Sequence, residues 1–386
     1  MKILVVCTRM PAANKNGDQV LSYHRLCYLA QRHTVHVLCF SPGDNELERR
    51  VLEMLGIVVH TVPWQLNYAA WFLFKALFNN SIPFQCAFYT SFSFQRLFDK
   101  VIKEFNPDVL CLVTIRTACN IKFFKGPLYI DLVDSMGLNY ERRSNAAKGI
   151  KRFFFKIESQ RALSFERSIV LRAQKSFLVS SLDKVYIGLQ NISVLPLGID
   201  LRRFVRSPKI PGDCVVIIFS GNMFYGPNIE AVLWFVKWCW HEIKLKVPGV
   251  KLMIAGSNPI KAIKKLESDA SIEVTGRVES MATVLNASQV SIAPMQSGSG
   301  MQFKILEAMA CGVPVVATSI GLGAIGAVPG QNILIGDRPE DFIRQVLKLL
   351  KEPDYRLNIA EAGYKYVLEN NSWDLINRAF SVECSL

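Results

Sequence analysis

The chain of 386 residues is 50% hydrophobic, which excludes general disorder, and it is too long for one ordinary core. Its 45 basic and 32 acidic residues give a net charge of +13, which favours a polyanionic partner: a nucleotide, a nucleic acid or an anionic membrane surface. The longest apolar run, "AAWFLF", ends at Lys75, well short of the roughly 18 residues that a membrane-spanning helix needs. We therefore expect a globular protein of two domains.

The first residues predict a strand. After "MKILVVC" the chain meets Arg9 and Pro11, which is typical of a first strand and not of the apolar segment of a signal peptide. We therefore expect a cytoplasmic location. The ten cysteines lie mostly inside apolar runs and form no CxxC pair, which indicates buried, reduced thiols.

Short apolar runs alternate with helical patterns along the whole chain. In the first half, strands are predicted over residues 2–7, 34–40, 57–62, 109–113, 128–133 and 176–179, and helices over 18–31 and 92–104. In the second half, strands are predicted over 215–219, 250–255, 272–275, 290–293, 315–317 and 333–335, and helices over 228–245, 302–310 and 340–350. Continuously apolar strands between helices indicate parallel sheets that are covered on both faces. The predicted fold class is α/β, with two doubly wound Rossmann-like domains facing a cleft.

The domain boundary is predicted in "VLPLGIDLRRFVRSPKIPGDCVV", where three prolines and a polar patch separate the two series of strands. This gives an N-terminal domain over residues 1–205 and a C-terminal domain over 206–371. In the remaining tail, residues 372–386, Trp373, Ile376 and Phe380 recur at helical spacing.

Gly17 and Asp18 close a long loop behind the first strand and open a helix. Backbone amides at such a helix start can receive a phosphate. An ordinary helix cap at Asp18 is the alternative, and the sequence leaves both open.

Residues 142–172 carry nine basic and two acidic side chains around the aromatic cluster Phe153–Phe155. Such a segment can bind anionic lipid headgroups. It can equally be a solvated helix whose phenylalanines pack inward. A nucleic-acid partner is not expected, because no recognised binding motif is present. The five histidines form no metal or base constellation.

A glycine-bearing loop, residues 294–300, connects the strand at 290–293 to a helix that carries Lys304 and Glu307. The loop amides, the helix N-terminus and Lys304 together suit a phosphate. Glu307, one turn later, can accept paired hydrogen bonds from vicinal hydroxyls such as those of ribose. The alternative is a solvated Lys–Glu pair on the helix surface.

The segment "GSGMQFKILEAMACGVPVVAT" resembles the donor-site signature of retaining GT-B glycosyltransferases of family four. "FSGNMFYGPNIEAVLWF", "VKLMIAGSNP" and "IEVTGRVES" precede it in the order that this family uses. "NKNGDQVLSYHRLCYLAQRHTVHVLCF" and "YIDLVDSMGLNY" resemble sugar transferases associated with exopolysaccharide gene clusters. The resemblance implies a retaining enzyme that moves a sugar from a nucleotide-diphosphate-sugar to a glycan or lipid-linked acceptor in surface polysaccharide synthesis. It also implies that the terminal helix crosses back onto the N-terminal domain.

By the same resemblance, Lys304 contacts the diphosphate and Glu307 the ribose. Asp134 contacts a sugar hydroxyl or orients the acceptor, whereas Asp131 is expected to be structural. Lys304 and Asp134 are the catalytic candidates. The other donor-binding candidates are Gly17, Asp18, Gly221, Asn222, Arg277, Ser299, Gly300 and Met301.

Two departures from the family pattern stand out. Ser299 occupies the position where the family often has a second glutamate, so backbone amides of residues 297–301 or another residue would take over its role. The Arg/Lys pair that many members place after the first strand of the second domain is replaced by Asn222 and Asn228. Lys304 and Arg277 would then neutralise the diphosphate, and no metal cofactor is expected.

Three other functions are compatible with parts of this pattern. A nucleotide-sugar epimerase has the same fold, but the clustered carboxylates and histidines for ring chemistry are not seen. An NAD-dependent dehydrogenase would carry GxGxxG after the first strand, and this chain does not. A catalytically weak nucleotide-sugar-binding protein is favoured if Ser299 marks lost catalysis. For the transferase we expect a peripheral location at the inner membrane face; the base, the sugar, the acceptor and the oligomeric state are not identified.

Overall fold

The computed structural model describes residues 1–41, 43, 45–79, 81–121, 124–207, 215–297 and 301–386. The chain forms two compact units. Unit 1 comprises Met1–Pro196 and Ile376–Leu386, and unit 2 comprises Leu197–Leu375. The division therefore falls after Pro196, earlier in the chain than the predicted boundary at residue 205.

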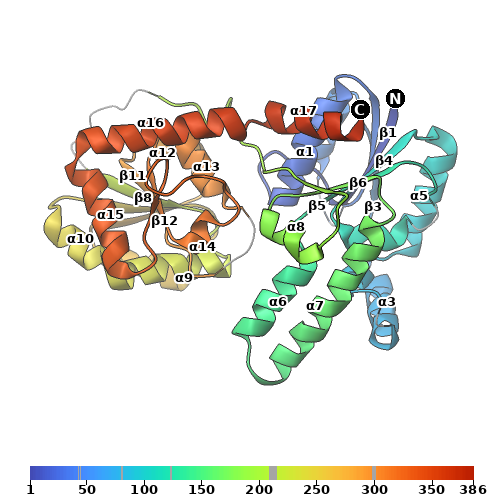
Figure 1. Cartoon of the computed structure of the whole chain (residues 1–386), viewed down its shortest axis with the longest axis horizontal. Coiled ribbons are helices and arrows are strands. Elements are labelled where there is room, and N and C mark those ends of the chain that lie inside the picture. The colour runs from blue at the N-terminus through green and yellow to red at the C-terminus, as the bar shows by residue number, and fades with distance from the viewer. Residues whose placement is uncertain (42, 44, 80, 122–123, 208–214, 298–300) are drawn as a thin grey trace. The chain divides into compact units, whose positions relative to one another are not determined.

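Over its described residues, unit 1 holds one parallel sheet with the strand order β3-β2-β1-β4-β5-β6-β7 (Figure 1). The strands are β1 (Lys2–Arg9), β2 (Thr34–Phe40), β3 (Val58–Val62), β4 (Val109–Val113), β5 (Leu128–Val133), β6 (Lys175–Leu178) and β7 (Ile192–Val194). The helices are α1 (Gly17–Ala30), α2 (Glu46–Met54), α3 (Leu66–Phe78), α4 (Phe84–Phe88), α5 (Phe92–Phe105), η1 (Ile115–Asn120), α6 (Met136–Ala146), α7 (Gly149–Val170) and α8 (Ser181–Ile187). The central strands are apolar on both faces because helices cover both.

Unit 2 repeats this plan over the part that the structure describes, with the strand order β10-β9-β8-β11-β12-β13. The strands are β8 (Val216–Ser220), β9 (Lys251–Ala255), β10 (Ile272–Gly276), β11 (Val290–Ala293), β12 (Val315–Ala317) and β13 (Leu334–Ile335). The helices are α9 (Gly226–Phe235), η2 (Val236–Trp240), α10 (His241–Lys246), α11 (Lys261–Lys264), η3 (Lys265–Ser268), α12 (Met281–Asn286), α13 (Phe303–Ala310), α14 (Ser319–Leu322), α15 (Pro339–Lys351) and α16 (Pro353–Asn370), and α17 (Trp373–Cys384) continues into unit 1.

The strand order of each sheet reverses beside its first strand, between β1 and β4 in unit 1 and between β8 and β11 in unit 2. The predicted α/β class with two doubly wound sheets is thus confirmed. Ligands of such sheets bind beyond the carboxyl ends of the strands at this reversal. Each unit therefore has one edge at which a binding site is expected.

Two observations bear on the other composition-based expectations. All described cysteines are free and, apart from Cys27, buried, which agrees with reduced thiols. Within the described ranges, no helix combines the length and the apolar character needed to cross a bilayer.

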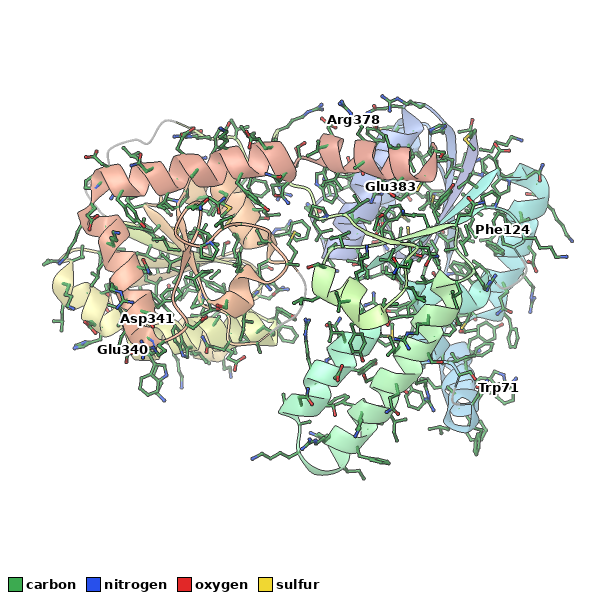
Figure 2. All side chains as sticks on the ribbon, viewed as in Figure 1. Trp71, Phe124, Glu340, Asp341, Arg378 and Glu383 are labelled. Carbon is green, nitrogen blue, oxygen red and sulfur yellow. The ribbon has the colours of Figure 1, made fainter. Side chains whose placement is uncertain are left out.

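The end of α17 is anchored in unit 1 by Arg25 of α1. The Arg25 guanidinium donates to Asn377 Oδ1 (2.8 Å) and to Asp131 Oδ2 (2.7 Å), and it lies 3.7 Å from the centre of the Phe380 ring. Nearer the end of the helix, Glu383 pairs with Lys175 of β6 at 2.7 Å (Figure 2). Asp131 is therefore a structural carboxylate, because it holds a buried arginine that in turn holds the terminal helix.

We predict that Arg25→Ala lowers the free energy of unfolding by about 3 kcal/mol or more, because it leaves the buried Asp131 carboxylate without its cation. Denaturant unfolding measures this change. Arg32→Ala is the matched control, because Arg32 lies just beyond α1, exposed, and its guanidinium donates to the Tyr28 hydroxyl. A double variant, Arg25→Ala with Asp131→Ala, should be less destabilised than the sum of the two single variants. Additive losses would show that the ion pair does not hold this region.

Candidate functional site

Glycines bring backbone close to the carboxyl edge of the unit 2 sheet. Gly221 follows β8 with φ +152° and Gly256 follows β9 with φ +147°. A Cβ atom on Gly256 would lie 1.8 Å from the Gly221 carbonyl oxygen, so only glycine fits there. A Cβ atom on Gly221 would lie 2.7 Å from Asn228 Nδ2 and 3.4 Å from Lys304 Nζ. The Gly221 backbone thus stands directly beside the Lys304 amine.

Lys304 lies in the first turn of α13, and only 7% of its surface is exposed. Its Nζ donates to Asn228 Oδ1 at 2.7 Å, contacts Met295 Sδ at 3.7 Å and lies 4.1 Å from the centre of the Phe219 ring. Burial lowers the pKa of Lys304 to about 7. The alternative of a solvated lysine at this position is therefore wrong.

Asn228, near the start of α9, holds the amine in place. Its side-chain Nδ2 donates to the Asn222 carbonyl at 3.0 Å, which turns Oδ1 toward Lys304. The Asn222 side chain instead accepts from the Phe224 amide at 3.0 Å and shapes the turn. Of the two asparagines Asn222 and Asn228, Asn228 thus contacts the Lys304 amine through its side chain, and that side chain is neutral.

Glu307 follows one turn later on α13 and is half-buried. Burial raises its pKa to about 7, against the opposing charges of Arg203 and then Lys304. Sequence reasoning missed Arg203. It lies in the segment between β7 and β8, where no sequence pattern separates it from its basic neighbours.

The remaining unit 2 candidates lie around this edge. Met301 is buried just before α13, and Arg277 is exposed directly after β10. Ser299 and Gly300 lie outside the described residues. Ser297, beside them, makes a hydroxyl contact to the Glu230 carboxylate of α9.

The unit 1 edge gathers two arginines around Asp18. Arg9, the last residue of β1, donates from Nε to Asp18 Oδ2 at 3.2 Å, and Arg116 Nη1 lies 4.0 Å from the same oxygen. The N-cap of α1 is Asn16, and Gly17 and Asp18 are its first helical residues. The predicted alternative of a cap at Asp18 is therefore wrong. Sequence reasoning also missed Arg9 and Arg116 as site residues, although both stand at or just behind the ends of predicted strands.

Asp134 belongs to the same edge, just behind β5. Its Oδ2 accepts from Asn139 Nδ2 at 2.8 Å, and burial raises its pKa. Beside it Val133 has φ +69°, and Thr114 behind β4 has φ +61°. Such backbone costs a β-branched residue about 1–3 kcal/mol and is found mostly at functional sites. The strain supports a site at this edge but assigns no role to Asp134.

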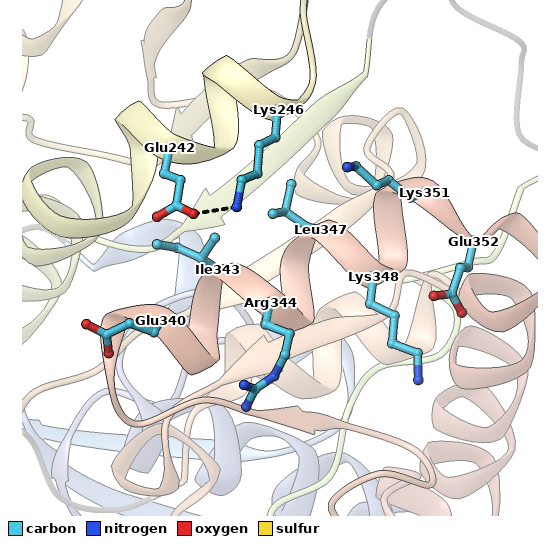
Figure 3. Close-up of a pocket in the computed structure, with 9 residues that line it drawn as sticks. All are labelled: Glu242, Lys246, Glu340, Ile343, Arg344, Leu347, Lys348, Lys351 and Glu352. Carbon is cyan, nitrogen blue, oxygen red and sulfur yellow. Dashed lines mark hydrogen bonds and ion pairs between the residues drawn. The ribbon is translucent and has the colours of Figure 1, made fainter.

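Among the described residues, no group of three or more His, Cys, Asp or Glu side chains is placed to hold a metal ion. A shallow hollow between α10 and α15, shown in Figure 3, is lined by Glu242, Lys246, Glu340, Ile343, Arg344, Leu347, Lys348, Lys351 and Glu352. None of these is a predicted site residue.

Residues 214–352 match the family model described as "Glycosyl transferases group 1". An uncharacterized 44.6 kDa protein in the cps region of Klebsiella pneumoniae is 27% identical over 162 residues, which is 40% of this chain and 42% of that protein. A GDP-mannose-dependent monoacylated alpha-(1-6)-phosphatidylinositol monomannoside mannosyltransferase of Corynebacterium glutamicum is 28% identical over 207 residues, 47% of this chain and 53% of that protein. The chain thus matches about half the length of these relatives, or less.

Solved structures agree in fold along the whole chain. Sucrose-phosphate synthase of Thermosynechococcus elongatus has a TM-score of 0.71 at 13% identity, covering 99% of this chain and 98% of that one. HepE of Anabaena, solved in complex with UDP, has a TM-score of 0.69 at 15% identity, covering 100% of both chains. Residues 214–352, in unit 2, are therefore similar to group 1 glycosyltransferases, and the chain has the GT-B fold over its length.

Proposed function

We propose that this protein is a retaining glycosyltransferase that transfers a sugar from a nucleoside-diphosphate-sugar. The observation that carries the proposal is the buried Lys304 amine at the carboxyl edge of the unit 2 sheet, beside the Gly221 backbone. The matched domain supports it. So do the mannosyltransferase relative, whose name gives GDP-mannose as its donor, and the neighbour solved with UDP.

The amine suits a diphosphate for an electrostatic reason. A buried ammonium group is costly unless an anion pairs with it, and the acceptor of its hydrogen bond is the neutral Asn228 amide. A diphosphate at the start of α13 would supply the missing anion and would also meet the positive end of the helix dipole. Its free donors would come from Lys304 and from backbone N–H groups at the α13 N-terminus.

Sugar transfer uses the same groups. As the bond between the anomeric carbon and the diphosphate oxygen breaks, negative charge grows on the β-phosphate, and Lys304 stabilises it more strongly than in the ground state. Arg277 adds a second positive charge, and the proposal requires no metal. Glu307 accepts hydrogen bonds from the ribose hydroxyls. In unit 1, Asp134 contacts a sugar hydroxyl or orients the acceptor, and Gly17 and Asp18 lie near the leaving phosphate.

The acceptor is a glycan or a lipid-linked glycan, and the process is the synthesis of a surface polysaccharide. The relative in the cps region of Klebsiella pneumoniae supports this assignment. We place the protein in the cytoplasm, attached peripherally to the inner membrane face through the basic segment of residues 142–172.

We predict that Lys304→Met weakens nucleotide-sugar binding roughly 100-fold, because a charge-assisted hydrogen bond to phosphate is lost. The fold should persist, because the substitution removes a desolvated charge and keeps the volume. Calorimetric titration with a panel of UDP- and GDP-linked sugars measures the affinity. The matched control is Lys251→Met, which removes an exposed lysine from the same unit. Equal affinity in both variants would rule out the diphosphate site at Lys304.

Donor affinity should fall as pH rises above about 7. The free protein has Lys304 with a pKa near 7, and a bound diphosphate favours the charged form, so binding takes up a proton above that pH. The dissociation constant should rise by up to about tenfold per pH unit until the pKa of the complex is reached. In Lys304→Arg the guanidinium stays charged, so this alkaline loss of affinity should disappear. An unchanged pH profile in Lys304→Arg would mean that another group titrates.

Glu307→Gln should weaken donor binding roughly tenfold, because the amide keeps the shape but accepts weaker hydrogen bonds from the ribose hydroxyls. The comparison of a ribonucleotide-sugar with its 2′-deoxy analogue isolates the effect. Wild type should distinguish the two, and Glu307→Gln should distinguish them less. Full discrimination in the variant would move the ribose contact to another residue.

A further inference from the structure

Helix α3 has the reverse of the usual burial pattern, with small side chains buried and large apolar ones exposed. It buries two of its three alanines, Ala69 and Ala76, and exposes a stripe of large apolar side chains. The stripe consists of Trp71, Phe74, Leu77 and Phe78, with Phe78 80% exposed. Figure 2 shows Trp71 pointing outward from the helix. Single exposed apolar residues are ordinary, but a stripe of four on one helix face marks an interaction surface.

The first half of α7 also exposes large apolar side chains. Ile150, Phe153, Phe154 and Ile157 follow the helical spacing and are all exposed, Ile150 at 85% and Phe153 at 66%. Farther along, the helix buries charged residues, among them Glu158 and Glu166. The alternative in which the phenylalanines pack inward is therefore wrong for Phe153, whereas Phe155 does pack against the core of unit 1.

The two stripes are linked through α4. Phe154 of α7 stacks on Phe84 of α4, with ring centres 5.7 Å apart, and α3 packs against the same short helix. In Figure 1, α3, α6 and α7 project from the same side of unit 1. We group the two stripes, which lie on helices that both contact α4, under the name aromatic face.

Positive charge surrounds the aromatic face and negative charge is absent from its sequence segments. Lys75 lies 4.8 Å from the Trp71 ring centre, and Lys151, Arg152 and Lys156 flank the α7 stripe and are exposed. Residues 54–98 and 142–157 contain no aspartate or glutamate. Two copies of this face would repel each other, whereas an anionic surface would attract it.

We propose that the aromatic face docks on an anionic lipid bilayer, with the α3 and α7 stripes inserted among the headgroups and the lysines and Arg152 against lipid phosphates. Aromatic side chains suit this interface, and flanking cations add electrostatic attraction. Docking by the aromatic face extends the membrane attachment that we proposed through residues 142–172. It rests on the proposed function for the identity of the acceptor. It adds α3, and with it an apolar contribution to binding that salt does not screen.

The test is co-sedimentation with vesicles made of equal parts phosphatidylcholine and phosphatidylglycerol, and with vesicles of phosphatidylcholine alone. Wild type should bind the anionic vesicles, more weakly at high salt but still measurably. The double variant Trp71→Gln with Phe78→Gln should lose roughly 100-fold in partitioning, and the binding that survives high salt should be lost. The double variant Lys151→Gln with Lys156→Gln should lose about fivefold per cation, at low salt only.

Trp238→Gln is the matched control. Trp238 of unit 2 is 53% exposed against 48% for Trp71, and Lys237 lies over its ring as Lys75 lies over Trp71. This variant should bind vesicles like wild type. Far-ultraviolet circular dichroism of every variant confirms folding.

Two outcomes overturn the proposal: wild type that stays in the supernatant with anionic vesicles at low salt, or the aromatic variant that binds as wild type does. Self-association of wild type that the aromatic variant abolishes, measured by sedimentation velocity, would assign the face to a second copy instead. Hydrolysis of nucleotide-sugar by wild type without vesicles tests the glycosyltransferase proposal separately from docking. Wild type that hydrolyses nucleotide-sugar but does not bind vesicles rejects only docking by the aromatic face. Wild type that binds vesicles but does not hydrolyse nucleotide-sugar rejects the transferase.

Discussion

The unit 2 site depends on a buried amine whose hydrogen-bond acceptor is an uncharged amide. Lys304 donates to Asn228, and Asn228 is oriented by the Asn222 carbonyl. An asparagine fixes the position of the amine without supplying the negative charge that burial calls for. A carboxylate in the same place would satisfy Lys304 permanently and would repel a phosphate. With a neutral partner for Lys304, this edge stays suited to the anionic ligand that we propose.

The surrounding backbone follows from the same requirement. Gly221 and Gly256 allow two strand ends to meet almost in contact, and a side chain at Gly221 would occupy space beside the amine. In unit 1 the equivalent edge is arranged differently. There Asp18 already pairs with Arg9, and the strain lies in the backbone of Thr114 and Val133. One strand order thus gives two edges of different electrostatic character, one with a buried amine whose hydrogen-bond acceptor is neutral and one with a carboxylate paired to arginines.

The strands were predictable because buried parallel strands are continuous apolar runs, and β2, β4, β5, β11 and β12 begin and end where the sequence indicates. The helix that carries Lys304 and Glu307 was predictable because a glycine-bearing loop marks its start in the sequence. The partner of Lys304 was not, because Asn228 lies 76 residues away and only the fold brings them together. The same holds for the Arg25–Asn377 bond, which spans 352 residues and decides where the chain's last helix packs. The exposed stripe of α3 was missed because its apolar run is typical of a core segment, whereas the structure fully buries only Ala69 and Ala76 of this helix.

Because α3 exposes its large apolar side chains, these side chains are available for binding and matter little to the stability of the fold. A side chain that is exposed in the folded state gains little from folding, so Phe74 and Phe78 contribute little hydrophobic free energy to the native state. Their apolar surface can therefore be buried against a partner without any rearrangement of the core. The fold itself is held by other contacts, such as the buried pair of Glu158 with Arg161. The aromatic face is thus already exposed in the folded chain, and docking costs it mainly the side-chain freedom of its outer residues.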